Sequence, residues 1–471
     1  MLLVSIALSL VANWVASENI TGLTGEVACG HAFPAILLDP LGASVCLMVL
    51  GILLSPFVGT FETMSDVMIH RFGPVVGGLA SALSLTGSML WAGVLMEGLA
   101  VWFAPNVDFL ENEQTHEFKT QKMEGVQSSR YGVEWLVALD MFFGSCDLPI
   151  LKRLLSGAQY KAILSLAASL NLFPSEFLEA SVALGLLLWF VAGGLMADIW
   201  LDALSMLIVA PTMILLAYVA VNETPHAAWE AEQVHVWSVA PSLAANKFAV
   251  GLFGNLFTEE LAGRILSARS PGQAKVACII AALLFGSIGL SPAVLGIWAK
   301  SMLKHAEMDL CESQDEIIGM TVKQLLPGQF HGRDHLLVAI LILESLNTVD
   351  TSILMCAKVM TNQAQRFRFT LQIPGADTAS IVLALGIVIG VSRFGENVWE
   401  LAEWATAAVG VPLALLCLLI PFQATDRWTA GLSAFVAQGG FLLLISQNVE
   451  MPFVWALLMG MISYGIIRMK S

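Results

Sequence analysis

Oxygen-bearing side chains gather inside an apolar stretch near residue 347. The segment reads LNTVDTSILM and contains Asn347, Thr348, Asp350, Thr351 and Ser352. Amide, hydroxyl and carboxylate groups cost free energy in hydrocarbon, so such a cluster in a membrane-crossing segment marks a functional site. Oxygen ligands of this kind suit a hard cation. The alternative is hydrogen bonding between small polar residues of packed helices, which the carboxylate of Asp350 disfavours.

A second polar interruption lies in the first hydrophobic segment. An unwound turn there would free the backbone carbonyls of Ala12 and Val15 for a cation, and would turn the start of the second half-helix toward a polar substrate group. The alternative is an intact helix whose polar face packs in a bundle. An unpaired carboxylate at Glu18 favours the interruption, because it requires a role in the membrane. The stretch ANWVASENITG contains Asn13, Ser17, Glu18, Asn19, Thr21 and Gly22.

Few other residues have a type or spacing that would support binding or catalysis. Asp202 follows GGLMADIW at a predicted junction of two spans and is either a functional carboxylate or an ordinary interfacial one. The loop sequence HGRDH lacks the spacing of helical zinc ligands. The chain contains no HExxH, no nucleophile elbow and no Walker loop, so the sequence gives no support to an enzyme or an ATP-driven pump.

The elements that must position these residues are membrane helices. Of the 471 residues, 57% are hydrophobic and 13% charged, with a mean hydropathy of +0.77, whereas soluble proteins carry roughly 25% charged residues. An all-α polytopic membrane protein in a lipid bilayer is therefore predicted. The net charge of −15 argues against nucleic acid as a partner. The seven cysteines have no paired spacing and are expected to be packing residues.

Hydropathy predicts about twelve spans, and a long segment, 105–175, is inserted between the third and the fourth. The insert begins with a polar part and continues with an amphipathic one. The predicted spans are 2–33, 36–59, 75–104, 176–198, 199–221, 246–266, 274–300, 334–360, 377–393, 397–421, 428–446 and 451–468.

The distribution of basic residues predicts a cytoplasmic N-terminus. Loops on the predicted cytoplasmic side carry groups such as Arg264, Arg269 and Lys275, whereas the opposite loop from 222 has no Lys or Arg before Lys247. Exceptions lie in the insert and in the acidic loop 301–333. The N-terminus has no basic n-region, so no cleaved signal peptide is expected.

Four segments, in order, resemble the sodium/solute symporter family. SLVANWVASENITGLTGE resembles its first core helix, GGLMADIWLDALS its GGL…TD.iQ junction, ELAGRILSARSPGQAK its qR.l.akd…A run, and LNTVDTSIL the helix that carries its STADS.L pattern. The resemblance covers most of the chain from Ser5 to about Arg427. It implies a LeuT-type core of two inverted five-helix repeats with helices one and six broken. The expected layout is a first repeat at 1–221 containing the insert, a second at 222–421, and two further helices at 422–471.

The resemblance also implies a sodium site between the first and eighth core helices. Its ligands fall on the carbonyls of Ala12, Val15 and Glu344 and on the side chains of Asn347 and Thr348, where Asn347 replaces the usual serine. Asp202 matches the aspartate that some members associate with a further sodium, and Asp350 is the other candidate for a second cation.

Substrate residues follow more weakly from the choline branch of the family. Trp14 and Trp91 align with two aromatic residues that enclose a quaternary ammonium there by cation–π attraction, while the third aligns with Thr258. Packing is an equally good interpretation of both tryptophans. Glu18 or Glu259 could instead attract an amine-bearing solute. The predicted substrate-binding set is Trp14, Glu18, Asn19, Trp91, Gly254 and Thr258.

The expected function is a sodium-coupled symporter in the cell (inner) membrane that imports a small organic solute, with amine-containing or zwitterionic solutes slightly favoured. Its partners would be that solute, sodium and the bilayer. One alternative is proton coupling, with Asp202 or Glu18 titrating. The other is a non-transporting scaffold or sensor, because the helix that usually precedes the family's core does not precede Ala12 here.

Overall fold

The structure is a computed structural model that describes residues 2–15, 18–118, 174–224, 240–303, 317–325, 348–349, 351–363, 383, 398–422, 426–447 and 449–470. The chain divides into two compact units, one of Met1–Leu99 with Trp189–Ser471 and one of Ala100–Leu188. Every element assigned within these described residues is helical. The candidate site lies in the larger unit. Most of the predicted insert 105–175 falls outside the described residues.

The first helix is broken where the polar residues interrupt it. Helix α1 (Leu2–Ala12) ends, a non-helical turn follows, and the π-helical turn η1 (Glu18–Gly22) leads into α2 (Leu23–Ala28). The Thr24 hydroxyl donates to the carbonyl of Ile20 at 2.6 Å, which holds the junction of η1 and α2. The predicted interruption is therefore confirmed.

The second crossing is a helix with a kink in its first half. It consists of α3 (Ala32–Ile36), the π-helical stretch η2 (Leu37–Gly42), α4 (Ala43–Leu54) and a short 3₁₀ turn, η3 (Ser55–Phe57). The backbone of Asp39 is extended, with φ −147° and ψ 118°. Pro40 causes this, because proline lacks an amide donor and disfavours helical backbone in the residue before it.

Two long helices each extend from the larger unit into the smaller one. Helix α5 (Met64–Phe118) bends at Gly73, whose φ of +78° is readily adopted only by glycine. Helix α9 (Pro174–Glu223) continues through residues 198 and 199. The predicted boundary of two spans at that point is therefore wrong. The local sequence, MADIWLDALSMLI, contains neither Gly nor Pro to stop a helix.

The predicted break in the sixth core helix is also present. Helix α11 (Pro241–Gly254) ends, and α12 (Glu259–Leu266) begins after four non-helical residues. The next predicted span, 274–300, consists of two helices, α13 (Pro271–Ile288) and α14 (Ser291–Leu303), separated at Gly289 and Leu290.

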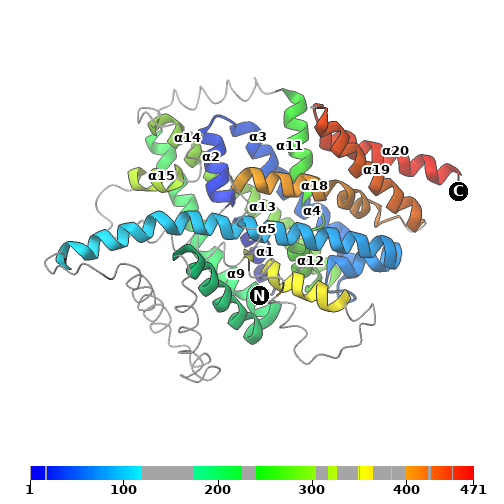
Figure 1. The fold of residues 1–471 in the computed structure, drawn as a ribbon, viewed down its shortest axis with the longest axis horizontal. Coiled ribbons are helices and arrows are strands. Elements are labelled where there is room, and N and C mark those ends of the chain that lie inside the picture. The colour runs from blue at the N-terminus through cyan, green and yellow to red at the C-terminus, as the bar shows by residue number, and fades with distance from the viewer. Residues whose placement is uncertain are drawn as a thin grey trace, which may run out of the picture. The chain divides into compact units, whose positions relative to one another are not determined.

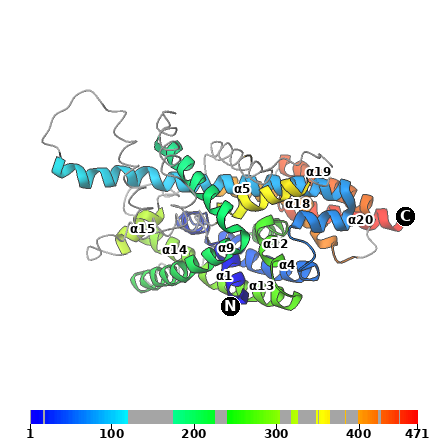
Figure 2. The ribbon, with the colours of Figure 1, turned by 90° about the horizontal axis from the view of Figure 1, so that it is seen from below.

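Later helices complete the described bundle (Figures 1 and 2). A further helix spans residues 351–363 and is referred to below as the 351–363 helix. The Thr429 backbone N–H and hydroxyl donate to the carboxylate of Asp426, cap the helix that follows, and lower the pKa of that carboxyl. The remaining helices are α15 (Ile317–Leu325), α18 (Val398–Leu419), α19 (Arg427–Ser446) and α20 (Pro452–Lys470).

Packing gathers the broken helices in the middle of this unit. Helix α13 packs against both α1 and α4, α14 packs against α2, and α18 lies between α11 and α19. The kinked η2 packs on α11, where Gly42 and Gly251 bring the two backbones together. A Cβ atom on Gly251 would collide with the Leu38 carbonyl oxygen. Small residues allow such close approach of membrane helices.

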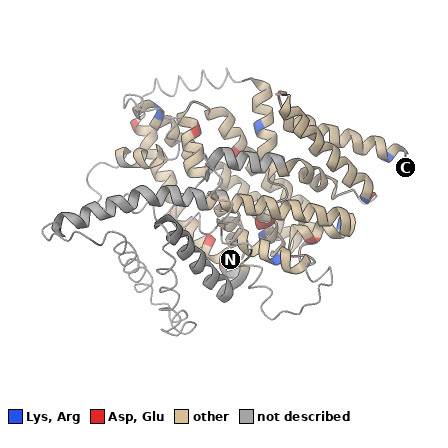
Figure 3. Cartoon of the chain, viewed as in Figure 1, with Lys and Arg blue, Asp and Glu red and all other residues tan. Residues whose placement is uncertain are grey.

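The described helices have the length and composition of membrane spans. Charged residues are sparse along them, and in α19 and α20 they lie near the helix ends (Figure 3). Six spans in the described part are long and apolar enough to cross a bilayer. They are Ala32–Phe57, Met64–Gly93, Asp198–Glu223, Pro271–Met302, Arg427–Ser446 and Pro452–Met469.

Candidate functional site

A buried arginine forms the centre of the polar interior. Arg264 lies on α12 and its side chain is 0% exposed. Its Nε donates to the Ser9 hydroxyl at 2.6 Å, and its Nη1 donates to the Asn13 amide oxygen at 2.7 Å. The planar guanidinium presents five donors in fixed directions, so one side chain can contact several helices at once.

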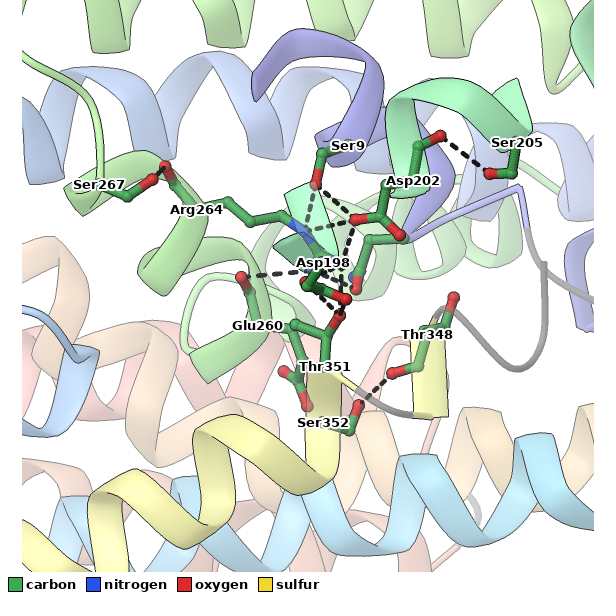
Figure 4. Close-up of polar contacts among 11 residues, drawn as sticks. Ser9, Asp198, Asp202, Ser205, Glu260, Arg264, Ser267, Thr348, Thr351 and Ser352 are labelled. Carbon is green, nitrogen blue, oxygen red and sulfur yellow. Dashed lines mark hydrogen bonds and ion pairs between the residues drawn. The ribbon is translucent and has the colours of Figure 1, made fainter. Parts of the chain in front are cut away.

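Two carboxylates of α9 face this guanidinium (Figure 4). Arg264 Nη2 lies 2.7 Å from Asp202 Oδ2 and 3.5 Å from Asp198 Oδ2. Both aspartates are buried. Truncating one partner of a buried ion pair leaves an uncompensated charge, so the pair constrains the elements that carry it.

Two hydroxyl groups mediate between the arginine and the carboxylates. Ser9 Oγ accepts from Arg264 and donates to Asp202 Oδ2 at 2.5 Å. Thr351 Oγ1 accepts from Arg264 Nη2 at 2.6 Å and donates to Asp198 at 2.8 Å. The network, defined as Arg264, Asp198, Asp202, Ser9, Asn13 and Thr351, therefore joins α1, α9, α12 and the 351–363 helix.

The predicted sodium ligands that the structure describes lie next to this network. Ala12 and Val15 are buried at the end of α1, on either side of Asn13 and Trp14. Thr348 is buried one helical turn before Thr351, and its carbonyl accepts from the Ser352 hydroxyl at 3.0 Å (Figure 4). Glu344, Asn347 and Asp350 lie outside the described residues.

This donor set fits a sodium ion. The helical hydrogen-bond pattern of α1 ends at Ala12 and the next helical turn begins at Glu18, so carbonyl groups lie in an interruption. Unwound carbonyls together with a hydroxyl are the donors that coordinate sodium in transporters with broken helices. The ligand set as a whole stays a prediction.

The positive charge that compensates Asp202 is the guanidinium of Arg264. Both Nε and Nη2 of Arg264 donate to its Oδ2, at 3.1 and 2.7 Å. The sequence placed Arg264 among the basic residues of a cytoplasmic loop, and that placement is wrong because the side chain is fully buried within α12. Its ion-pair partners, Asp198 and Asp202, lie on another helix, so no local spacing in EELAGRIL indicates the pair.

The predicted substrate residues lie around the two helix breaks. Trp14 is buried and stacks on Phe285 of α13, with ring centroids 5.4 Å apart. Asn19 is buried in η1, and its Nδ2 donates to Asp39 Oδ2 at 2.6 Å. Trp91 on α5 is half-buried. The side chain of Glu18 lies outside what the structure describes.

The last two predicted substrate residues flank the break between α11 and α12. Gly254 ends α11 and lies against Gly410 of α18, where an added Cβ would be 2.9 Å from the Gly254 Cα. Thr258 precedes α12, and its hydroxyl donates to the carbonyl of Asn255 at 3.1 Å. The sequence therefore located both breaks and several residues beside them, but it did not single out Asp39.

The adjacent carboxylates of α12 have different surroundings. Glu259 accepts from the backbone N–H groups of Met64 at 2.8 Å and Ser65 at 3.0 Å, so it caps the N-terminus of α5. Glu260 accepts from the Ser88 hydroxyl at 3.1 Å through Oε2. Its buried Oε1 has no hydrogen-bond partner among the described residues. These donors hold the carboxylate of Glu259 at the start of α5, and its role as an attractor of an amine-bearing solute stays a prediction.

Solved structures of the same architecture cover nearly the whole chain. One is a sodium-coupled sialic acid symporter in a substrate-bound, outward-open state that reveals a novel sodium site; it is 12% identical, with 99% of this chain and 95% of that chain covered and a TM-score of 0.59. Another is Mhp1 in an inward-facing conformation, 13% identical, with 98% and 91% covered and a TM-score of 0.51. The sequence matches no protein-family model and no curated protein.

These likenesses confirm the predicted fold class. The chain has the LeuT-type, all-α architecture of a multi-pass integral membrane protein. At such low identity they show the fold alone. The division into repeats at 1–221 and 222–421, with two further helices at 422–471, stays a prediction.

Proposed function

We propose that this chain is a sodium-coupled secondary active transporter that imports a small organic solute, amine-containing or zwitterionic, by alternating access. The observation that carries the proposal is that Arg264 bonds both to Asn13, in the non-helical turn after Ala12, and to Thr351, one turn after the buried Thr348. Sodium bound there would supply a positive charge that links the two helices through oxygen ligands.

The residues around this position support coupling between the ion and the conformation. Asn13, directly after Ala12, and Thr351, one turn after Thr348, are both bonded to Arg264. The two helices that would hold sodium are thus the same two that Arg264 joins to α9 and α12. An ion that binds one arrangement of these helices more tightly shifts the equilibrium toward it, and the same free energy couples it to the solute.

Ligand-dependent stabilisation of the purified protein tests the proposal. Thermal unfolding is followed with and without sodium at constant ionic strength, across amines, amino acids, sugars and carboxylates. A ligand that binds the folded state raises its apparent stability by mass action. We expect a shift that requires sodium together with one solute class. Absence of any sodium response at any concentration would overturn the proposal.

Thr348 is the residue at which the sodium assignment can be tested. Thr348→Ala removes a buried hydroxyl, and we expect the sodium concentration for half-maximal uptake to rise about tenfold or more, because an ion loses one oxygen ligand. Thr348→Ser keeps the hydroxyl and should stay near the wild type. Thr361→Ala removes another buried hydroxyl, within the 351–363 helix and away from Thr348 along the chain, and serves as the matched control. Unchanged sodium dependence in Thr348→Ala would refute the site.

One observation favours proton coupling as the second candidate. Glu260 is buried, and its Oε1 has no hydrogen-bond partner among the described residues, so a proton could be carried there. Uptake into proteoliposomes separates the two candidates. A sodium gradient at equal pH drives uptake if the main proposal holds, whereas a pH gradient without sodium drives it if the proton is the coupling ion.

A further inference from the structure

Asp39 is a membrane-embedded carboxylate that neither the sodium assignment nor the Arg264 network uses. It lies in the span Ala32–Phe57, which has a hydropathy of 2.2. Its extended backbone interrupts the helix before Pro40. An ionisable residue in such a span is expensive and is a functional-site candidate by default.

The side chain of Asp39 meets the broken first helix. Asp39 Oδ2 accepts from Nδ2 of Asn19 at 2.6 Å, which joins the kink in η2 to the π-helical turn η1. Asn19 is 0% exposed. Asp39 is thus held at the level of the break in the first helix, the region that also contains the predicted sodium ligands Ala12 and Val15.

Two acceptor oxygens of this pair have no partner among the residues that the structure describes. Asp39 Oδ1 and Asn19 Oδ1 are both buried, and neither has a hydrogen bond within the described part of the chain. The ion pairs found among the described residues involve Glu26, Glu62, Asp198 and Asp202 as acids, so none of them neutralises Asp39. The two side chains are hydrogen-bonded to each other, and each leaves a buried oxygen without a donor among the described residues, which is the chemistry of a site for a cation that donates hydrogen bonds.

We propose that Asp39 and Asn19 bind the ammonium group of the transported solute, and that this ammonium carries N–H bonds, as in a primary or secondary amine. The inference rests on the proposed transport function and names the residues that select its substrate class. Both free oxygens would accept from the same ammonium, and the charge of Asp39 would be compensated only when the solute is bound.

The aromatic residues near the break argue against a quaternary ammonium. Trp14 is 4% exposed and its ring is stacked on Phe285. Cation–π recognition requires a ring face within about 6 Å of the cation. A stacked, buried ring offers little of that face. Hydrogen bonding through Asp39 and Asn19 is available instead.

The test compares amines with matched analogues on the purified full chain. The probes are ethanolamine, γ-aminobutyrate and putrescine, each set against a partner in which the ammonium is replaced by a methyl or trimethylammonium group. We expect at least one primary amine to stabilise the protein in the presence of sodium, with its matched analogues at least tenfold weaker. Asp39→Asn should weaken the amine about ten- to hundredfold, because a charged hydrogen bond is lost.

Control variants separate recognition from folding. Asp66→Asn removes another buried carboxylate, one that accepts from Asn362, and amine affinity should be unchanged. Asp39→Glu keeps the charge with a longer side chain and should lose less affinity than Asp39→Asn. If Asp39→Asn is unstable, the probe series on the wild type alone decides, since only the amine partner of each set should bind.

The outcomes distinguish the inference from the proposed function. Sodium stabilisation with no amine binding overturns the Asp39 assignment and leaves the transport proposal standing. A rise in the sodium midpoint of Asp39→Asn with unchanged amine affinity also overturns it, because the carboxylate would then serve an alkali ion. No response to sodium or solute overturns the transport proposal itself.

Discussion

At the scale of the residue, the buried guanidinium of Arg264 determines whether the carboxylates around it are compensated. Its guanidinium is compensated by Asp202 and Asp198, both on α9. Arg264→Met has a similar volume and no charge, so two buried carboxylates lose their cation. Breaking a buried pair from one side costs about 3–5 kcal/mol. We expect Arg264→Met to unfold at much lower temperature than the wild type, measured by the intrinsic fluorescence of the 13 tryptophans.

A double substitution tests whether the loss arises from uncompensated charge. Arg264→Met with Asp202→Asn removes the closest unpaired carboxylate, and part of the lost stability should return. If the two changes simply add, the Arg264–Asp202 contact at 2.7 Å is not an energetic pair.

The partners of Arg264 and Asp39 could not be predicted from the sequence. Arg264 and Asp39 are each a single charged residue within or next to an apolar run. A hydropathy profile averages over such a residue and does not indicate that it has a buried partner. The partners that explain them, Asp202 and Asn19, are distant along the chain by 62 and 20 positions. A contact between such residues depends on helix packing, which one sequence without its fold does not specify.

At the scale of the element, Glu259 fixes one helix to the start of another. It is the first residue of α12, and it accepts from the backbone N–H groups of Met64 and Ser65 and from the Ser65 hydroxyl at 2.5 Å. A carboxylate at a helix N-terminus satisfies free donors and complements the helix dipole. This contact therefore holds the N-terminus of α5 beside the break between α11 and α12.

Removing this cap should loosen the start of α5. Glu259→Ala leaves two amide donors without their acceptor, and loss of a cap costs about 1 kcal/mol, and up to about 2 kcal/mol. We expect faster hydrogen exchange at residues 64–67, measured by mass spectrometry. Glu26→Gln is the matched control, because Glu26 pairs with the exposed His31 and such pairs contribute little. Equal exchange in Glu259→Ala and the control would contradict the capping role.

The helix breaks were predictable, whereas some helix ends were not. Polar residues within an apolar run predicted the interruption after Ala12, because backbone groups left unsatisfied in lipid cost free energy and a break needs polar surroundings. The break after Gly254 was expected only from the family resemblance. The continuity of α9 and the division between α13 and α14 were missed. Span lengths of about 20 residues fit one long helix or two short ones, and local composition does not choose between them.

At the scale of the whole molecule, composition determined the class and the order of four motifs determined the fold. Similarity to solved structures over 99% and 98% of the chain confirms the LeuT-type architecture. The ligand set for sodium was only partly placed, since Thr348 and Ala12 are described while Asn347 and Glu344 are not. Substrate choice depends on contacts between helices. Asp39 could therefore be proposed as a substrate-binding residue only once the fold was known.

The exposed aromatic residues of α19 allow a test of how deeply this helix lies in the bilayer. Phe435 is 75% exposed near the middle of α19, and Trp428 is 69% exposed at its start, beside Arg427. If α19 crosses the membrane, Phe435 lies at the depth where arginine costs about 2.5–3.5 kcal/mol, whereas Trp428 lies at the interface, where a long basic side chain reaches water.

We therefore expect Phe435→Arg to reduce the amount of folded protein extracted from membranes, measured by size-exclusion chromatography in detergent, while Trp428→Arg stays near the wild type. Both substitutions replace an exposed aromatic residue of the same helix by the same cation, so they differ mainly in depth. Equal recovery of the two variants would mean that α19 does not span the bilayer. The membrane placement of the C-terminal helices would then have to be revised.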